Sequence, residues 1–194
     1  DPAASSVPES TAPPTVSNAA TAQPAASVAV IGSGPAGLAA AADLARSGYS
    51  VTVYEKEDQP GGLLRYGIGP YRLPRTVLDY EIDTIRRLGV TIRTSHPVDS
   101  GPALDQLRAT HAAVLGATGS WADRKLGVPG EGLSGVSGCI DFLTELYRGR
   151  APDLPESVAV IGDGNAAFDL ARALVRLGTR VTLISWFPEE LIPA

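Results

Sequence analysis

Apolar and polar positions follow one another in the same order twice along this chain. In residues 27–55, an apolar run is followed by a glycine-rich turn, an alanine- and leucine-rich stretch, a short glycine loop and a second apolar run. Residues 157–185 repeat this order, and the two segments align without a gap. A strand, a turn, a helix and a strand in this order form the βαβ unit that binds dinucleotides. We therefore expect an α/β fold with two Rossmann-like βαβ nucleotide-binding units.

The apolar spacing also predicts where the individual elements lie. Short continuous apolar runs indicate strands buried on both faces, and apolar residues three or four positions apart indicate amphipathic helices. The expected elements are buried strands over 28–31, 112–115 and 158–161, further strands over 50–54 and 90–94, and helices over 35–47 and 78–88.

The glycines of the first turn have the spacing of a dinucleotide-binding fingerprint. Gly32, Gly34 and Gly37 match G-x-G-x-x-G. The first permits a tight turn, the second lets a pyrophosphate approach the backbone, and the third lets the helix pack closely on the strand. The helix that begins at Pro35 would direct its N–H groups at the phosphates. Glu55 ends the second strand, where a carboxylate can accept both ribose hydroxyls of an adenosine.

Composition narrows the class of function. The chain of 194 residues carries a net charge of −5 and is 44% hydrophobic, yet has no apolar run long enough for a transmembrane helix. It has no dense cluster of basic residues, so we expect neither a membrane nor a nucleic-acid partner. Cys139 is the single cysteine, which excludes a dithiol centre and an iron–sulfur ligand set and favours a buried structural thiol in a reducing, cytoplasmic setting. His96 and His111 fit no catalytic or metal-ligand pattern.

Four further segments carry a resemblance to a known family. They are GGLLRYGI at 61–68, YRLP at 71–74, ATG at 117–119 and RKLGVPGE at 124–131. With these segments, residues 26–194 resemble the FAD- and NAD(P)H-dependent oxidoreductases of the glutamate synthase small-subunit type. The same module occurs in dihydropyrimidine dehydrogenase and in ferredoxin-linked NADPH oxidoreductases. One departure is visible, because the family's Ile-Pro-acid-aromatic stretch lacks its acid at 68–71.

The resemblance implies FAD as the cofactor of the first unit. It places Leu63 and Arg72 at the FAD, with Arg72 near the flavin half, and it brings the backbone of Val98 to the adenine. The ATG turn would close over the diphosphate. The full set of residues expected at this cofactor is Gly32, Gly34, Pro35, Ala36, Gly37, Glu55, Lys56, Gly62, Leu63, Arg72, Val98, Thr118 and Gly119.

The second unit is expected to hold NADPH or NADH. Its turn is a G-x-G-x-x-A variant, and the residues expected at the pyrophosphate are Gly162, Gly164, Asn165, Ala166 and Ala167. Ser185 occupies the position that Glu55 has in the first unit, so the acid of an NAD site is missing from the strand end. Trp186 and Phe187 stand where the family usually has two arginines for a 2′-phosphate. Asp163 is awkward beside phosphates, and Asp169 is expected to be either a solvated acid or an acid of the N-terminal turn of the helix.

The chain is expected to divide into three parts. Residues 1–24 are rich in Ala, Pro, Ser and Thr and have no aromatic residue, which predicts a disordered tail or linker. Residues 25–150 would form the FAD-binding domain and residues 151–194 the start of the NAD(P)-binding domain. Since the strands that complete the second domain are absent, we expect a piece of a longer flavoprotein.

Our interpretation is an FAD-dependent oxidoreductase module. A nicotinamide cofactor on the second unit would reduce the flavin, which would pass electrons to an iron–sulfur domain or a synthase large subunit, either on a separate chain or on the same longer chain. The resemblance implies glutamate formation from 2-oxoglutarate and glutamine-derived ammonia as one final reaction. The alternative is a non-catalytic or truncated flavin- or nucleotide-binding module. A thioredoxin reductase-like enzyme is disfavoured because no CxxC is present.

Overall fold

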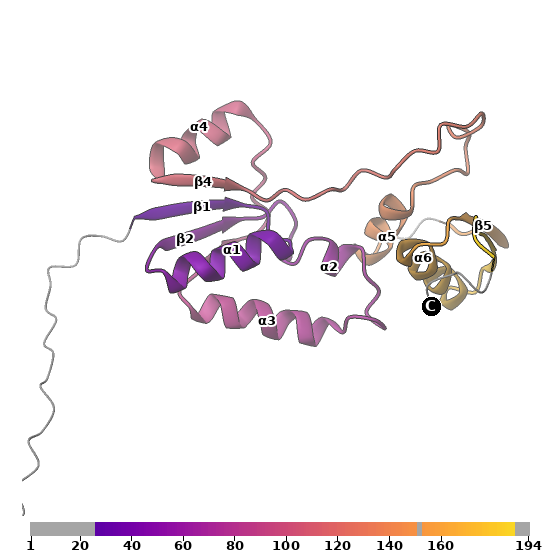
Figure 1. Cartoon of the computed structure of the whole chain (residues 1–194), viewed down its shortest axis with the longest axis horizontal. Helices are drawn as coiled ribbons and strands as arrows, with labels where there is room; N and C mark the ends of the chain where they lie inside the picture. Colours follow the sequence, from indigo (N-terminus) through magenta and orange to yellow (C-terminus); the bar gives the residue numbers. More distant parts are fainter. Residues whose placement is uncertain (1–25, 151–152, 189–194) are drawn as a thin grey trace, which may run out of the picture.

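The computed structural model describes residues 26–150 and 153–188. It consists of two α/β units, each with a sheet of parallel strands (Figure 1). The tail predicted over 1–24 lies outside these residues. The elements in chain order are β1 (Ser27–Ile31), α1 (Pro35–Arg46), β2 (Ser50–Tyr54), α2 (Leu63–Tyr66), α3 (Arg75–Arg87), β3 (Thr91–Arg93), α4 (Gly101–Thr110), β4 (Ala113–Gly116), α5 (Cys139–Tyr147), β5 (Ser157–Ile161), α6 (Asn165–Arg176) and β6 (Arg180–Ile184).

The first unit is a four-stranded parallel sheet with the strand order β3-β2-β1-β4. β1 pairs with β2 on one side and with β4 on the other, so it is a central strand. The helices α1 and α3 cover one face of this sheet, and α4 lies on the opposite face (Figure 1). The strand order changes direction at β1, and in open parallel sheets such a point places a ligand crevice at the carboxyl ends of the strands. The expected α/β fold is confirmed.

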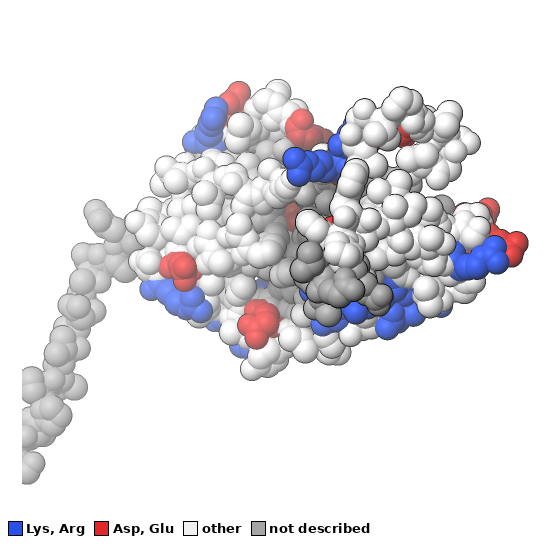
Figure 2. Space-filling view, turned by 45° about the vertical axis from the view of Figure 1, so that its right-hand side comes forward, with Lys and Arg blue, Asp and Glu red and all other residues white. Residues whose placement is uncertain are grey.

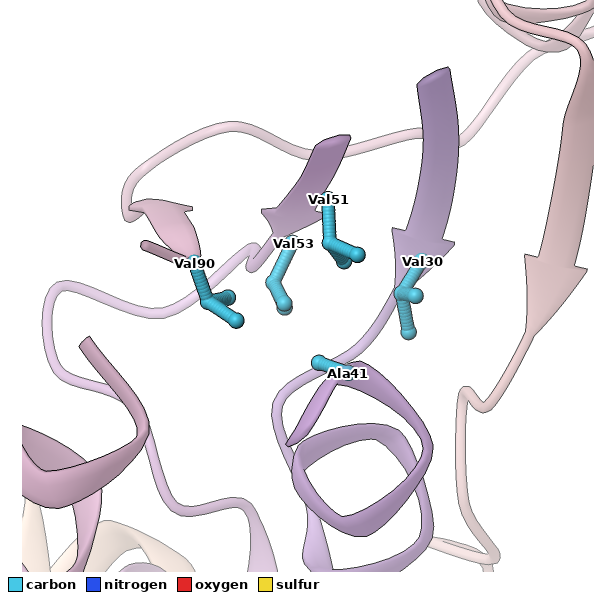
Figure 3. Packing of buried hydrophobic residues seen from close by; sticks show 5 residues of the cluster. All are labelled: Val30, Ala41, Val51, Val53 and Val90. Carbon is cyan, nitrogen blue, oxygen red and sulfur yellow. The ribbon is translucent and has the colours of Figure 1, made fainter. Parts of the chain in front are cut away.

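A cluster of small apolar side chains fixes α1 on the sheet. Val30, Val51, Val53 and Val90 are almost fully buried and point toward Ala41 of α1 (Figure 3). Successive side chains of a strand point to opposite faces, so Val51 and Val53 share the α1 face of β2. Alanine at the contact lets the helix approach closely, which holds the first turn of α1 at the end of β1.

The prediction of buried strands is confirmed for β1 but wrong for two others. In β1, Val28, Ala29 and Val30 are buried. In β4, by contrast, Val114 is half-buried and its neighbours are exposed, and in β5 only Val160 is buried. Within the described residues β4 is an edge strand, and β5 has a single partner strand, which leaves their surfaces open.

The residues that cap α1 and α3 explain where these helices begin and end better than the spacing of apolar residues does. α1 ends at Arg46, and Gly48 has φ +88 and donates its N–H to the Ala45 carbonyl at 3.0 Å, as expected for a glycine that terminates a helix. α3 begins at Arg75, earlier than the predicted start, because Pro74 is extended and its carbonyl accepts the first helical hydrogen bond from Val77.

The second unit repeats the strand–helix–strand arrangement. β5 and β6 pair in parallel, with Ser157 opposite Arg180 and Ile161 opposite Ile184. Val160, Ala167 and Leu174 form its core, against which Phe142 of α5 packs. α5 also contacts α2 of the first unit, so this helix bridges the two units.

Charges are interspersed on the face shown in Figure 2, where basic and acidic side chains alternate between broad uncharged areas. Among the helices of the described residues, none is both long and apolar enough to cross a membrane.

Candidate nucleotide-binding sites

The first glycine-rich turn is closed tightly by the ATG segment. Gly32 has φ +101, a conformation that side chains rarely adopt, and its N–H donates to the Tyr54 carbonyl at 2.8 Å. A Cβ on Gly32 would overlap the Ala117 carbonyl, and a Cβ on Gly37 would overlap the Gly32 carbonyl. At Gly34, in contrast, a Cβ would meet nothing within 4 Å. The turn is therefore packed on its protein side and open at Gly34, where the sequence predicts the pyrophosphate.

A second glycine loop lies directly against this turn. Gly62 has φ +54, and a Cβ there would come within 2.8 Å of the Gly34 Cα. The Gly61 N–H donates to both the carbonyl and the hydroxyl oxygen of Ser33, each at 3.1 Å. Leu63 follows as the first residue of the short helix α2. The segment that the resemblance assigns to FAD is thus held beside the predicted pyrophosphate position by the backbone and the hydroxyl of Ser33.

Glu55 is buried at the carboxyl end of β2 and is tied to the glycine turn. Its carboxylate accepts hydrogen bonds from the Ser33 N–H at 2.8 Å, from the Ser33 hydroxyl, and from the Glu57 N–H at 2.9 Å. Its residue exposure is 3%. These hydrogen bonds hold the carboxylate at the strand end where a ribose is expected.

Val98 and Gly119, two further residues expected at FAD, follow the edge strands β3 and β4 of the sheet. The loop after β3 is fixed to the loop after β2, since the His96 N–H donates to the Glu55 carbonyl at 2.8 Å. Val98 follows and packs, half-buried, beside Tyr54 and Leu107. On the other side, Gly119 has φ +75 within the ATG segment.

Lys56 and Trp121 mark one border of this region. The ammonium group of Lys56 lies 4.6 Å from the centroid of the Trp121 ring, and the Trp121 indole N–H donates to the Thr118 carbonyl at 3.0 Å. Both side chains line a cavity of about 290 Å³ together with α5 residues.

The second glycine-rich turn keeps the geometry of the first. Gly162 has φ +133 and donates its N–H to the Ile184 carbonyl at 2.9 Å, matching the bond that Gly32 makes. A Cβ on Gly164 would meet nothing within 4 Å, so this turn is also open at its second glycine. Asn165 and Ala166 begin α6, and Ala167 is buried under the turn. A Cβ on Gly162 would lie 3.5 Å from the Ala167 Cβ, an ordinary van der Waals distance, so this turn is closed less tightly than the first.

Asp163 organises the loop after β6. One of its carboxylate oxygens, Oδ2, accepts from the Ser185 hydroxyl and from the Trp186 N–H, both at 3.0 Å, and from the Phe187 N–H at 3.4 Å. The Trp186 residue is 80% exposed. Arg180 lies at the opposite end of β6 and pairs with Glu156 at 3.5 Å.

Arg72 contacts the second unit directly. Its guanidinium lies 2.8 Å from the carboxylate of Asp169 in α6, whose side chain is only 6% exposed. The expectation that Asp169 is a solvated acid is therefore wrong: α6 packs on the 69–73 loop and buries this side chain. The Tyr71 hydroxyl donates to the Asp169 carbonyl at 2.9 Å, which adds a second link between the loop and α6.

Buried polar atoms without a hydrogen-bond partner in the described part of the chain lie near the contact between the 69–73 loop and α6. Within the described residues, Asp169 Oδ1 and the Tyr147 hydroxyl are buried and make no hydrogen bond. Burial raises the pKa of Tyr147 to about 12 and also raises the pKa of Tyr71. Both phenols are therefore neutral at physiological pH, and Asp169 Oδ1 is left as an acceptor at the contact between the units.

The cysteine and the histidines contact residues beside the two turns. Cys139 is half-buried at the start of α5, and its Sγ lies 3.3 Å from the carbonyl of Ala166 in the second turn. Burial raises the pKa of Cys139 to about 11, so the thiol stays protonated. His96 and His111 both pack on the Tyr54 ring.

Both turns fit the phosphates of a dinucleotide. Each begins with a glycine at positive φ, is open at its second glycine, and leads into a helix whose first N–H groups have no partner within the helix. In the first unit the buried acid at the strand end completes the pattern. A single βαβ unit does not distinguish FAD from NAD(P), so the wider similarity of the chain decides the family.

Residues 26–194 match the family described as Pyridine nucleotide-disulphide oxidoreductase. The chain belongs to this family. FAD and NAD(P)H are its cofactors, so the expectation of these two cofactors is confirmed for the family. The expectation of an oxidoreductase is likewise confirmed for the family.

Three relatives from bacteria carry the resemblance predicted from the sequence. The chain is 46% identical over 79% of its length to the NADP(+)-dependent formate dehydrogenase subunit beta of Moorella thermoacetica, covering 22% of that protein. It is 43% identical over 86% of its length to the NAD-dependent dihydropyrimidine dehydrogenase subunit PreT of Escherichia coli K12, covering 40% of it. It is 37% identical over 78% of its length to the glutamate synthase [NADPH] small chain of Azospirillum brasilense, covering 34%. The chain thus spans well under half the length of these relatives.

A solved structure shows the same fold as this chain. Mycobacterium tuberculosis FprA in complex with NADPH superposes with a TM-score of 0.67 at 28% identity, over 77% of this chain and 36% of that one. This similarity confirms the Rossmann-like α/β arrangement.

Sequence reasoning did not identify Ser33 or Tyr147 as parts of the sites. The sequence could have indicated the role of Ser33, because Ser33 stands 22 residues before Glu55 and Asp163 stands 22 residues before Ser185. Comparing the two units position by position exposes both pairs. Tyr147 gives no such signal, since it reaches its place only when α5 packs between the units.

Proposed function

We propose that this chain is the two-nucleotide part of an NAD(P)H-dependent flavoprotein oxidoreductase, with FAD on the first unit and a nicotinamide dinucleotide on the second. Electrons would leave the flavin for a partner subunit or domain. The observation that carries the proposal is the pair of glycine turns, each open at its second glycine and built on parallel strands. The relatives named as subunits or chains of larger enzymes support a partner.

The roles proposed for the protein are binding and orientation. The open turn at Gly34 and the adjacent Gly62 would accept the pyrophosphate, while Glu55 would accept the ribose hydroxyls. FAD, when bound, supplies the exchange between two-electron and one-electron chemistry. The Arg72–Asp169 pair and the Tyr71 hydroxyl would hold α6, and with it the second turn, at a fixed position relative to the first unit. Positioning of two cofactors is the contribution that such a protein makes to the rate.

The natural acceptor reaction is a finer proposal. Glutamate synthesis is supported by the similarity to a glutamate synthase small chain, and an iron–sulfur partner is supported by the resemblance described above. A second candidate is a nucleotide-binding module without electron transfer. The open surface of the second unit, with Ile161 and Ile184 about half exposed, favours that candidate for the chain on its own.

Glu55 provides the test of the first site. We expect Glu55→Gln to weaken FAD binding by about 1–3 kcal/mol, about 5- to 150-fold, because a charged acceptor is lost from the ribose position. The measurement is a fluorescence titration of the apoprotein with FAD. Glu81→Gln is the matched control, since it makes the same change of charge at an exposed position on α3. Equal FAD affinity in the Glu55 variant and the control would contradict the assignment of this site.

A further inference from the structure

The two units carry the same pair of positions with the residue types exchanged. In the first unit Ser33 lies in the glycine turn and donates to Glu55 at the end of β2. In the second unit the acid, Asp163, lies in the turn, and the serine, Ser185, lies at the end of β6 and donates to it. In both units a carboxylate therefore lies between the glycine turn and the end of the second strand. The strand end supplies this carboxylate in the first unit, and the turn supplies it in the second unit.

One oxygen of the Asp163 carboxylate accepts hydrogen bonds from the described residues, and the other does not. Oδ2 accepts from the Ser185 hydroxyl and from the backbone N–H groups of Trp186 and Phe187, which fixes the orientation of the carboxylate. Oδ1 makes no hydrogen bond in the part of the chain that the structure describes, and the side chain is half-buried rather than covered. A carboxylate that is fixed at Oδ2 in this way can accept further hydrogen bonds at Oδ1.

We infer that Asp163 is the specificity-determining residue of the second site and selects a dinucleotide with a free 2′-hydroxyl, NADH, over NADPH. The inference rests on the proposed function, because it assumes that the second turn binds a dinucleotide. Oδ1 would accept the ribose hydroxyls, as Glu55 would do in the first unit. A 2′-phosphate placed at the same point would meet the negative charge of Asp163.

The charges of the surrounding segment support this selection. Residues 181–194 contain no Lys, Arg or His, so the segment after β6 supplies no cation for a 2′-phosphate. The nearest basic residue before it in the sequence, Arg180, is at the other end of β6 and pairs with Glu156. The exposed Trp186 ring can instead stack on an adenine, a contact that does not depend on the 2′ substituent.

The experiment is a calorimetric titration of the chain, saturated with FAD so that the first site is filled. The probes are ADP-ribose and 2′-phospho-ADP-ribose, which carry the adenosine half of NADH and NADPH. We expect ADP-ribose to bind at least about tenfold more tightly, the scale of one charged hydrogen bond gained or lost. Asp163→Asn should bring the two affinities to within about threefold of each other.

Two further variants make the test decisive. Glu156→Gln removes one charge at the opposite end of β5, where the side chain is 89% exposed, and should leave the preference unchanged. Asp163→Ser places in the turn the residue that the first unit has there as Ser33, should lose the preference for ADP-ribose, and decides the case if Asp163→Asn does not fold. Equal binding of both probes by the unaltered chain, or an unchanged preference in Asp163→Asn, would overturn the inference. Binding of neither probe would overturn the proposed function of the second unit itself, and the inference with it.

Discussion

Replacing Gly37 by alanine is expected to destabilise the first unit by about 1–3 kcal/mol and to abolish measurable FAD binding. The new Cβ would overlap the Gly32 carbonyl and press on the Ala117 side chain, whose Cβ would lie 3.3 Å away. To relieve the overlap, α1 must move away from the turn. That movement would shift the N-terminal N–H groups of α1 from the predicted pyrophosphate position. Thermal unfolding and a titration with FAD measure the two effects.

Gly34→Ala is the matched control for this prediction. A Cβ at Gly34 meets nothing within 4 Å, and its φ of −70 suits alanine, so the melting temperature should not change. FAD binding should still be lost, because the methyl group would occupy the space opened toward the pyrophosphate. Loss of binding in both variants with loss of stability only in Gly37→Ala would separate packing from ligand contact. An unchanged melting temperature in Gly37→Ala would contradict the packing described for this turn.

Removal of Arg72 is expected to release the second unit from the first. Arg72→Ala leaves the carboxylate of Asp169 buried without its cation, and the second oxygen of that carboxylate already lacks a hydrogen bond within the described residues. Loss of one partner of a buried pair costs about 3–5 kcal/mol, and about 1–3 kcal/mol is expected here because the Arg72 side chain is 44% exposed. Hydrogen exchange in α6 should increase strongly, while exchange in β1 and β2 should not.

The chain contains a close control for the Arg72 variant. Arg86 has the same side-chain exposure of 44% and the same distance of 2.8 Å to its partner, but the Asp83 side chain is 54% exposed. Arg86→Ala should therefore change stability by no more than about 0.5 kcal/mol. Similar effects of the two substitutions would show that the burial of Asp169 does not make the contact between the units strong.

Local patterns predicted what depends on neighbours in the sequence. The glycine turns and the termination of α1 before Gly48 follow from backbone conformations that few residues other than glycine adopt. The strand over 50–54 follows from a short apolar run, so the sequence identifies these features directly. Burial of β4 and β5 was predicted incorrectly because an apolar run reports what a strand could bury, and not which strands or helices the described chain places against it.

Long-range polar pairs were the features that the sequence did not reveal. Asp169 resembled an ordinary acid in the first turns of a helix, and only the packing of α6 on the 69–73 loop gives it Arg72 as a partner. The pairing of Asp163 with Ser185 was also missed. The sequence shows that Ser185 stands in the position of Glu55, and a position-by-position comparison of the two units gives the pair, but only the hydrogen bond shows that the two residues are in contact.

Electron transfer between the two proposed sites can be tested with the visible absorption spectrum of the purified chain with FAD, recorded before and after anaerobic addition of NADH. We expect a yellow protein that retains FAD through gel filtration and loses its flavin absorption when NADH is added, because the two units are held together by α5 and by the Arg72–Asp169 pair. A colourless protein that does not retain FAD would contradict the first site. A yellow protein whose spectrum does not change with NADH or NADPH would contradict electron transfer between the two sites.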